Sequence, residues 1–381
     1  MSSKRKLLYI TDQQEYTDHG TIGPLFNGYL KEYFDVYIIY FTKYKNSFQA
    51  KGTDYVVPQQ YKKEICQYLD VKGVELSSFD FVFVRNMLDI LSDVLKNRQK
   101  YGYKVGFRVS SPKTEEAYEA SKANNSSMIL GRLNTYYQRY NKTKLLAKCD
   151  IFMPTSKDME ETFYADSGVR SFPLPPGLDP ARITPHRKSD GDAKHFIYVG
   201  TLDSLRQFEQ VLIAFTKINS DNWHLNISTK NHQFAKTIMG RYASIKDQVS
   251  IIKADNLNEL MVQVDDCDIG IALLPDIPIY STAIPAKVMD YYTCAIPTLL
   301  TDNPKNRTLF TDEDAKFCKF EVDFIVEKLE EIIGMSEDEI AKMGHKGQEK
   351  LLSHKRNYKI MAKELYEELD THIIQESKCQ N

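Results

Sequence analysis

Residues 266–302 read DCDIGIALLPDIPIYSTAIPAKVMDYYTCAIPTLLTD, and this stretch decides the fold. Its apolar run at residues 268–274 predicts a buried strand, which a polar, proline-containing loop follows. A helix is predicted to open at residues 284–285, and a second strand is predicted at residues 296–301. Strand, loop, helix and strand in this order form a βαβ unit with parallel strands.

The predicted helix of this unit begins at the carboxyl end of a strand, where open α/β sheets bind ligands. Free backbone N–H groups and the helix dipole at such an end favour a phosphate group. Lys287 and Asp290 fall on the first turns, and a carboxylate one turn into the helix suits a pair of ribose hydroxyls. The pattern therefore predicts a site for a nucleotide diphosphate.

Bulk composition places the chain among globular proteins of about two domains, since it has 381 residues. A net charge of −2 gives no overall signal for nucleic acid or membrane binding. The six cysteines form no CxxC pair and are interpreted as reduced thiols of a cytoplasmic protein. The apolar run near the N-terminus is too short for a signal peptide, and no stretch is long enough to span a bilayer. Neither the cysteines nor the histidines have a metal-binding spacing, so no metal site is predicted.

Strands and helices alternate through both halves of the chain, with a proline-rich break between them at residues 172–193. We therefore predict two Rossmann-like doubly wound domains that face a cleft, residues 1–180 and 194–355, joined by a linker at 181–193. The predicted strands are 6–11, 35–41, 79–84, 104–109, 151–153, 195–199, 223–228 and 249–253, besides the two quoted above. The predicted helices include 24–33, 87–98, 127–148, 156–165, 324–333, 338–353 and 358–374.

The segment after the loop also resembles a known family. It is similar to the donor-binding block of GT-B fold glycosyltransferases, nearest to glycosyltransferase family 4 (glycosyl transferases group 1). The positions that match this block are Pro285, Lys287, Asp290, Tyr291 and Pro297. Of the family's two glutamates, the second corresponds to Asp290, whereas the first falls on Thr282, which has no carboxylate. The resemblance implies the GT-B fold, with residues 356–381 as a C-terminal helix that packs back on the N-terminal, acceptor-binding domain.

The resemblance further implies that the C-terminal domain binds a nucleotide-sugar. The family often has arginine after the glycine that here is Gly200, but this chain has Thr201. Arg206 stands where a lysine is expected, and its guanidinium suits a diphosphate; the alternative is a solvated helix residue. The predicted nucleotide-sugar-binding residues are Gly23, Gly200, Thr201, Arg206, Tyr280, Ser281, Thr282, Ala283, Ile284, Pro285, Lys287 and Asp290.

The N-terminal half supplies the catalytic candidates. The loop at residues 12–23 occupies the place of a glycine-rich loop in the family, and it carries Asp18 and His19. Arg108 ends a predicted strand near the place where many family members have a histidine. It is interpreted either as a contact to an acidic sugar or acceptor phosphate, or as a salt-bridged strand end. Retention of configuration follows the resemblance, and inversion would need a base, for which Asp12, Asp18, His19 and Glu115 are candidates.

Basic residues are concentrated at residues 96–148, where twelve bases stand against three acids. Tyrosines lie between them, so this stretch suits an acidic membrane or a lipid-linked phosphate acceptor. Solvated helix faces explain such a run equally well. RNA would also suit it, but no nucleic-acid motif accompanies the charge.

We therefore expect a cytoplasmic, metal-independent glycosyltransferase that moves a sugar from a UDP- or GDP-sugar to a hydroxyl of a glycan or lipid-linked acceptor. Cell-surface polysaccharide or glycoconjugate synthesis is the role the resemblance implies. No cofactor and no nucleic acid are expected, and residues 96–148 are the expected contact with the inner face of a membrane. The alternatives are an inverting glucuronosyltransferase-like enzyme, a nucleotide-sugar 2-epimerase, and a degenerate, non-catalytic binding protein.

Overall fold

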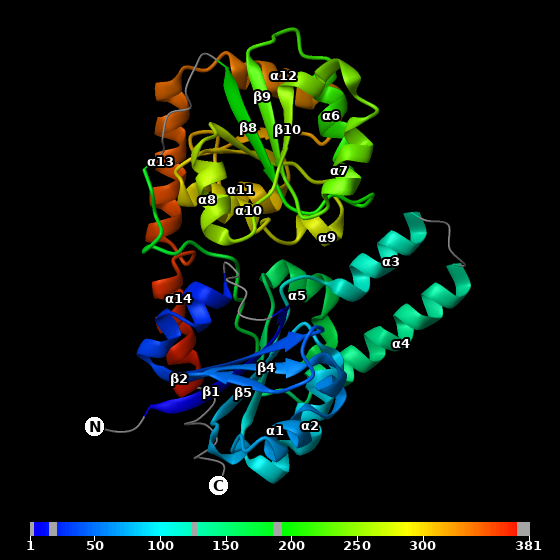
Figure 1. Cartoon of the computed structure of the whole chain (residues 1–381), viewed down its shortest axis with the longest axis vertical. Coiled ribbons are helices and arrows are strands. Elements are labelled where there is room, and N and C mark those ends of the chain that lie inside the picture. The colour runs from blue at the N-terminus through cyan, green and yellow to red at the C-terminus, as the bar shows by residue number, and fades with distance from the viewer. Residues whose placement is uncertain (1–3, 15–20, 124–127, 186–192, 372–381) are drawn as a thin grey trace. The chain divides into compact units, whose positions relative to one another are not determined.

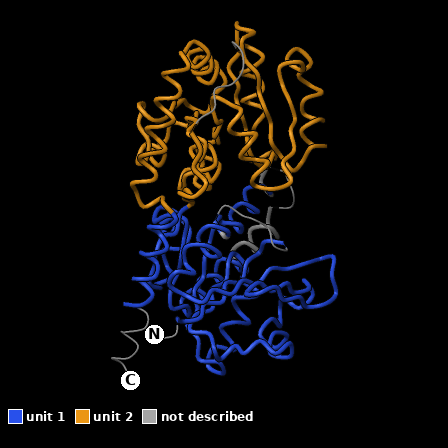
Figure 2. Tube along the Cα trace, turned by 60° about the vertical axis from the view of Figure 1, so that its left-hand side comes forward, with its two compact units in different colours: residues 1–175, 358–381 blue, residues 176–357 orange. Residues whose placement is uncertain are grey.

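The computed structural model describes residues 4–14, 21–123, 128–185 and 193–371. The chain divides into two compact units, Met1–Pro175 with Tyr358–Asn381, and Pro176–Asn357 (Figure 2). Each unit is a largely parallel sheet with helices on both faces (Figure 1). The predicted class, two Rossmann-like doubly wound α/β domains, is confirmed.

The first unit has a seven-stranded sheet in the order β3-β4-β2-β1-β5-β6-β7. Its strands are β1 (Arg5–Gln14), β2 (Phe34–Thr42), β3 (Gln49–Lys51), β4 (Asp54–Pro58), β5 (Phe81–Arg85), β6 (Lys104–Arg108) and β7 (Ile151–Met153). Only β3 runs antiparallel to its neighbour. Without β3, the order is that of a doubly wound nucleotide-binding sheet, and the direction of winding reverses between β1 and β5.

One face of this sheet is covered by short helical turns and by the last helix of the chain. These are η1 (Ile22–Phe26), η2 (Tyr29–Glu32) and α14 (Tyr358–Glu368). The helix buries an apolar stripe at Tyr358, Met361 and Leu365, and this stripe packs in one cluster with Leu7 and Tyr9 of β1. The C-terminal helix therefore returns to the first unit, as predicted.

The remaining helices of this unit are α1 (Ile65–Val71), α2 (Leu88–Tyr101), α3 (Lys113–Ala123), α4 (Met128–Leu146) and α5 (Lys157–Phe163), with the short turns η3 (Gln59–Glu64), η4 (Leu76–Ser78) and η5 (Ala165–Ser167). The helix predicted at residues 24–33 is wrong, because η1 and η2 are separate turns. They are interrupted at Gly28, whose backbone lies so close to the Pro24 carbonyl that a Cβ would overlap it. The backbone of Gly28, with φ −109° and ψ −100°, lies outside the helical region, so the helix is not continuous.

The second unit has a six-stranded parallel sheet in the order β10-β9-β8-β11-β12-β13. Its strands are β8 (Lys194–Val199), β9 (Trp223–Ser228), β10 (Val249–Ile252), β11 (Ile269–Ala272), β12 (Thr298–Thr301) and β13 (Lys316–Cys318). Its helices are α6 (Glu209–Thr216), α7 (His232–Met239), α8 (Leu257–Asp265), α9 (Pro278–Ser281), α10 (Lys287–Thr293), α11 (Pro304–Leu309), α12 (Val322–Ile333) and α13 (Glu337–Ser353), with the turn η6 (Ala243–Gln248). Here the winding reverses between β8 and β11.

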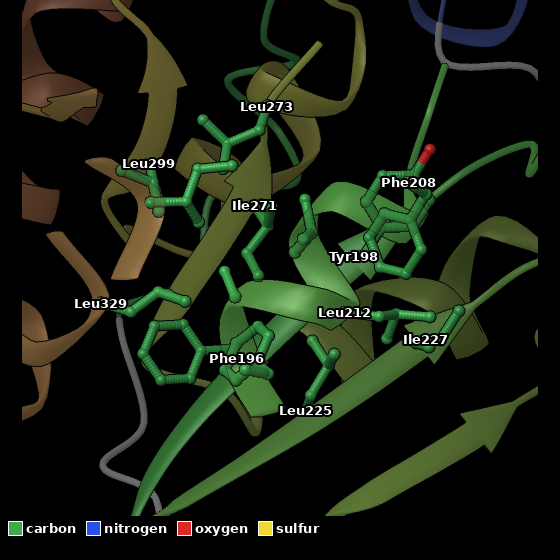
Figure 3. Close-up of a cluster of buried hydrophobic side chains, with 14 of the residues drawn as sticks. Phe196, Tyr198, Phe208, Leu212, Leu225, Ile227, Ile271, Leu273, Leu299 and Leu329 are labelled. Atoms are coloured by element: carbon green, nitrogen blue, oxygen red, sulfur yellow. The ribbon is translucent and has the colours of Figure 1, made fainter. Parts of the chain in front are cut away.

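Alternating residues of the central strands fill two separate cores in this unit. Phe196 and Tyr198 of β8 lie with Ile271 in the core under α6, α7 and α12 (Figure 3). Ile197 and Val199 face the other way, into the core under α8, α10 and α11. Both faces of the sheet are buried, which is the arrangement expected for parallel strands.

Candidate functional site

The reversal point between β8 and β11 is held by a tyrosine of α10. The two strands pair only at Phe196 with Ile269 and at Ile197 with Gly270. Further along, Val199 donates its backbone N–H to the Tyr291 hydroxyl at 3.0 Å, and that hydroxyl donates to the Ile271 carbonyl at 3.0 Å. Tyr291 thus continues the hydrogen bonding between the strands where their own ladder has ended.

Close packing of α10 against β11 fixes the position of this helix. A Cβ on Gly270 would overlap the Tyr291 ring, so the approach requires glycine at that position. Burial raises the pKa of Tyr291 well above its usual value, so its hydroxyl stays protonated and remains a donor. The helix is therefore anchored at the carboxyl edge of the sheet, with its first turn at the reversal point.

Lys287 lies one turn before this anchor and reaches the end of β8. Its Nζ is buried, has no hydrogen-bond partner among the described residues, and lies 3.5 Å from the centroid of the Tyr198 ring. The same ring packs on Phe208, at 4.2 Å between centroids (Figure 3). Burial, and then the charge of Arg206, lower the pKa of Lys287 well below its usual value. The ammonium group is thus held in place without the hydrogen bonds that a buried cation needs.

Gly200 provides the space beside this ammonium. Its φ of 132° lies in the region that favours glycine, and a Cβ there would lie 3.6 Å from the Lys287 Nζ. Backbone at the end of β8 and the lysine therefore lie side by side, at an edge where a phosphate can reach both.

Asp290 lies one turn beyond Lys287 on α10. Burial raises its pKa to about 7, and the nearby Lys287 charge opposes that rise. No hydrogen bond or ion pair is found for its carboxylate within the described ranges, so a salt bridge does not tie it to the core. Hydrogen-bond donors would stabilise the ionised form of this buried carboxyl group, and sugar hydroxyls are suitable donors.

Arg206 lies in the turn before α6, not on a helix. Its guanidinium forms an ion pair with Asp203, and its backbone N–H donates to the Asp203 Oδ1 at 2.9 Å. The guanidinium carbon is 5.6 Å from the centroid of the Tyr280 ring on α9. The structure therefore brings Gly200, Arg206, Tyr280 and Lys287 to one edge of the second unit.

The helix start was predicted two residues too early. Ile284 is buried in the core under α10, and Val288 donates to the Pro285 carbonyl at 3.1 Å in a turn that precedes the helix. Regular helix begins at Lys287 because an inward-facing Ile284 and a proline without an N–H define the turn before it. The helix is only seven residues long, so the lysine, rather than the helix dipole, supplies most of the positive charge here.

The other predicted donor residues are distributed around this edge. Ser281 ends α9, Thr282 is buried at the end of that helix, and Ala283 follows it. Thr201 is exposed, and its carbonyl accepts a hydrogen bond from the Tyr198 hydroxyl at 2.9 Å. Gly23 lies elsewhere, in η1 of the first unit.

Of the N-terminal candidates, Asp12, Arg108 and Glu115 belong to the described residues of the first unit. Arg108 ends β6 and is buried, whereas Asp18 and His19 lie outside the described residues. Burial alone would raise the pKa of Asp12, but Arg85 and Lys113 outweigh it and lower that pKa. A carboxylate with a lowered pKa is a poor general base at neutral pH.

Glu115, the other described candidate base, is also paired. It forms ion pairs with Arg139 and Lys142, and it is buried in α3. Burial would raise the pKa of Glu115, but Arg139 and Lys142 outweigh it, so its pKa is lowered. This carboxylate supports the packing of α3 and α4 and is not poised to take a proton.

Sequence reasoning missed Arg85 and Asn86, which follow β5. Arg85 forms an ion pair with Asp12 and donates to the Ser110 Oγ at 3.0 Å. The Asn86 side-chain amide donates to Asp12 at 3.2 Å and to the Ser110 Oγ at 2.8 Å. A signal was present, since two apolar strands, FVFVR and KVGFR, both end in arginine.

Asp268 has a structural role. It accepts a hydrogen bond from the His195 backbone N–H at 2.7 Å and joins the start of β11 to β8. Among the described residues, no group of three or more His, Cys, Asp or Glu side chains is placed to hold a metal ion.

Comparison with known proteins gives similarity in structure but not in sequence. No protein family profile matches the chain, and no curated sequence is significantly similar. The fold is similar to sucrose-phosphate synthase of Thermosynechococcus elongatus, with a TM-score of 0.72, 12% identity, and coverage of 96% of this chain and 99% of that one. HepE of Anabaena, solved with UDP and glucose, has a TM-score of 0.67 and 11% identity, with coverage of 96% and 100%.

A third similar structure is an alpha,alpha-trehalose-phosphate synthase (UDP-forming) of Burkholderia xenovorans in complex with glucose-6-phosphate. It has a TM-score of 0.65 and 11% identity, with coverage of 96% of this chain and 100% of that one. These likenesses extend over nearly the whole chain, so this chain has the GT-B fold. The resemblance to GT-B glycosyltransferases is thereby confirmed for the fold, without distinguishing family 4.

Proposed function

We propose that this protein is a glycosyltransferase that takes a nucleotide-sugar, with UDP as the favoured nucleotide, and transfers the sugar to an acceptor hydroxyl. The observation that carries the proposal is the Lys287 ammonium beside Gly200. Its Nζ is buried without a hydrogen-bond partner in the described part of the chain, at the reversal point of a doubly wound sheet, and the pKa of this amine is lowered. A diphosphate supplies the missing acceptors.

The diphosphate and the ribose each have a matching group on this edge. Lys287 and Arg206 would hold the diphosphate, and Asp290 would accept hydrogen bonds from the ribose hydroxyls. The two cations would stabilise the charge that develops on the leaving phosphate as the glycosidic bond to it breaks. UDP is favoured over GDP because HepE, a protein of similar fold, was solved with UDP and glucose.

Retention of configuration belongs to the same proposal. An inverting transferase needs a positioned base, and the two described candidates, Asp12 and Glu115, both have lowered pKa values. The leaving phosphate then serves as the group that takes the acceptor proton. The proposed role in making surface polysaccharide or glycoconjugate depends on the family resemblance alone.

Peripheral membrane contact is a weaker part of the proposal. In the basic stretch, Arg98, Lys100 and Lys104 form ion pairs with acids outside it, which reduces the positive surplus. The supporting observation is on α4, where Tyr137 and Tyr140 are 62% and 52% exposed. Co-sedimentation with vesicles containing phosphatidylserine tests it, and no binding at low salt would refute it. Among the described residues, no helix combines the length and the apolar character that crossing a bilayer requires.

The decisive test of function is nucleotide release from a panel of UDP- and GDP-sugars, with and without sugar and sugar-phosphate acceptors. A transferase releases nucleotide in an acceptor-dependent manner, and Lys287→Met should abolish that release. A non-catalytic binding protein would bind UDP without release under any condition. The substitutions at Thr201 and Thr282, relative to the family, are the features that favour this second candidate.

A further inference from the structure

Next to the reversal point of the first unit, two buried arginines lie side by side. Arg85 and Arg108 are register partners at the ends of the neighbouring strands β5 and β6, and they are only 4% and 2% exposed. Strands at this edge are the place where doubly wound sheets bind ligands. Neither arginine belongs to the nucleotide site proposed for the second unit.

The hydrogen bonding of these arginines is incomplete. Within the described ranges, the Nε of Arg85 and both the Nε and Nη1 of Arg108 are buried without a hydrogen-bond partner. The Arg108 Nη2 donates to the Leu174 carbonyl at 3.5 Å, which is long for a hydrogen bond. The guanidinium also acts on the buried Tyr9 hydroxyl, where burial raises the pKa and Arg108 opposes that rise. Guanidinium groups stay charged at any relevant pH, so deprotonation cannot relieve this cost.

The charges are also unbalanced. Asp12 is the carboxylate that faces this pair, and both of its oxygens are engaged, Oδ1 by Arg85 and Oδ2 by Asn86 and Lys113. Among the described residues, two guanidinium groups and one carboxylate leave a surplus positive charge in a buried position, and Lys113 adds a second, more exposed one. An unpaired buried charge is strongly unfavourable unless a counter-charge completes the site.

We propose that Arg108, with Arg85 and Lys113, forms an oxyanion site that binds a phosphate group carried by the acceptor. The Nε and Nη1 groups of the Arg108 guanidinium can each donate a charge-assisted hydrogen bond to an oxygen of a bound anion. That the ligand is an acceptor depends on the proposed transferase function. The anion site itself consists of residues of the first unit alone.

The test is thermal unfolding of the full chain with inorganic phosphate, against chloride at equal ionic strength. Phosphate should raise the Tm of the wild type, and Arg108→Met should weaken phosphate binding by about tenfold or more. Lys113→Ala, at an exposed position that carries little risk to folding, should weaken it by a smaller factor. No specific effect of phosphate on the wild type, or an undiminished effect in Arg108→Met, would overturn the proposal.

The direction in which Arg108→Met changes the Tm distinguishes an anion-binding arginine from one with a purely structural role. Without phosphate, Arg108→Met should unfold at a higher temperature than the wild type, because it removes an uncompensated buried charge. The matched control is Arg98→Met, in which the lost guanidinium was bonded to Asp150 and to the Lys148 carbonyl. That variant should lose stability and keep the phosphate effect. A lower Tm for Arg108→Met would contradict the charge surplus.

Two further arms identify the source of the phosphate and separate the two proposals. A hexose phosphate that binds more tightly than inorganic phosphate indicates a sugar acceptor, and a prenyl phosphate in detergent that does so indicates a lipid-linked one. UDP binding should be the same in Arg108→Met and the wild type. If UDP fails to bind but phosphate binds, the nucleotide proposal is wrong and the anion site remains; the reverse result refutes the anion site alone.

Discussion

Apart from the edge strand β3, the sheets of the two units have the same strand order, but different residues supply the positive charge near their reversal points. In the first unit the positive charge comes from Arg85 and Arg108, which are parts of the strands themselves. In the second it comes from Lys287, on the helix after the strand, with Asp290 one turn further on. Arginines within strands are held rigidly and stay charged. A lysine beside an acid on a helix can gain or lose its proton when an anionic ligand binds or leaves. The same fold thus provides a permanent anion site in one unit and an adjustable site in the other.

The largest predicted effect that tests this comparison is the loss of UDP affinity on substitution of Lys287. Lys287→Met should weaken UDP binding by about 2–3 kcal/mol, because charged hydrogen bonds to the diphosphate are lost. Calorimetric titration measures this change. The same variant should keep the wild-type response to inorganic phosphate, since that response belongs to the first unit. A UDP affinity within twofold of the wild type, roughly 0.4 kcal/mol, would exclude Lys287 from the site.

Asp290→Asn should have two effects of opposite sign. UDP binding should weaken by about 1–3 kcal/mol, since a charged acceptor for the ribose is lost. Stability without ligand should rise at pH 8. The unfolded acid ionises near its ordinary pKa of 3.8, but the folded one only near 7, so stability is lost as pH rises between these values. Asparagine does not ionise and avoids that loss.

Urea unfolding of Asp290→Asn and the wild type at pH 5 and pH 8 checks this sign. The variant should exceed the wild type in free energy of unfolding by more at pH 8 than at pH 5. The difference should be about 1–2 kcal/mol once solvent screening is allowed for. An advantage that is the same at both pH values would mean that Asp290 ionises normally in the folded chain.

Tyr291→Phe tests whether the bridge between β8 and β11 holds the second site in place. It leaves the Val199 N–H and the Ile271 carbonyl without their partner, which should cost about 1–2 kcal/mol of unfolding free energy. Denaturant unfolding measures it, with the exposed Tyr137→Phe as the control. If Tyr291→Phe is as stable as that control, the bridge does not anchor α10.

The smallest expected effect is a pH dependence confined to the second unit. Because the pKa of Lys287 is lowered, its charge is lost at a lower pH than that of an ordinary lysine. UDP affinity should therefore begin to fall at a lower pH than an ordinary lysine would cause, by about tenfold at most per pH unit. Lys287→Arg should remove this decline. Phosphate binding in the first unit should lack any such alkaline decline of protein origin, because its arginines do not titrate.

The sequence was sufficient for the architecture because apolar strands and helices alternate clearly in both halves. It also placed Gly200, Arg206, Lys287 and Asp290 near one another by position relative to strand ends. The edge strands β3 (QAK) and β13 (KFC) were missed because each is short and contains a lysine, whereas the equally short β7 (IFM) is wholly apolar and was predicted. The break at Gly28 was missed because a single glycine within an apolar period does not show that its backbone leaves the helical conformation.

Within the sites, the sequence identified residue types but not their surroundings. Tyr198 and Tyr291 belong to apolar patterns, and nothing in those patterns distinguishes a core tyrosine from one that supports a lysine or joins two strands. Arg85 ends a strand in the same way as Arg108, but its pairing with Asp12 joins residues 73 positions apart. Contacts at such separation depend on the strand order, which must be known before the cluster can be recognised.

The most direct measurement is a crystal structure of the protein soaked with UDP. The account predicts the diphosphate within hydrogen-bond distance of the Lys287 Nζ, next to the Gly200 backbone, with the ribose hydroxyls on the Asp290 carboxylate. UDP bound at any other edge, or an Asp290 carboxylate that contacts no part of the nucleotide, would contradict it.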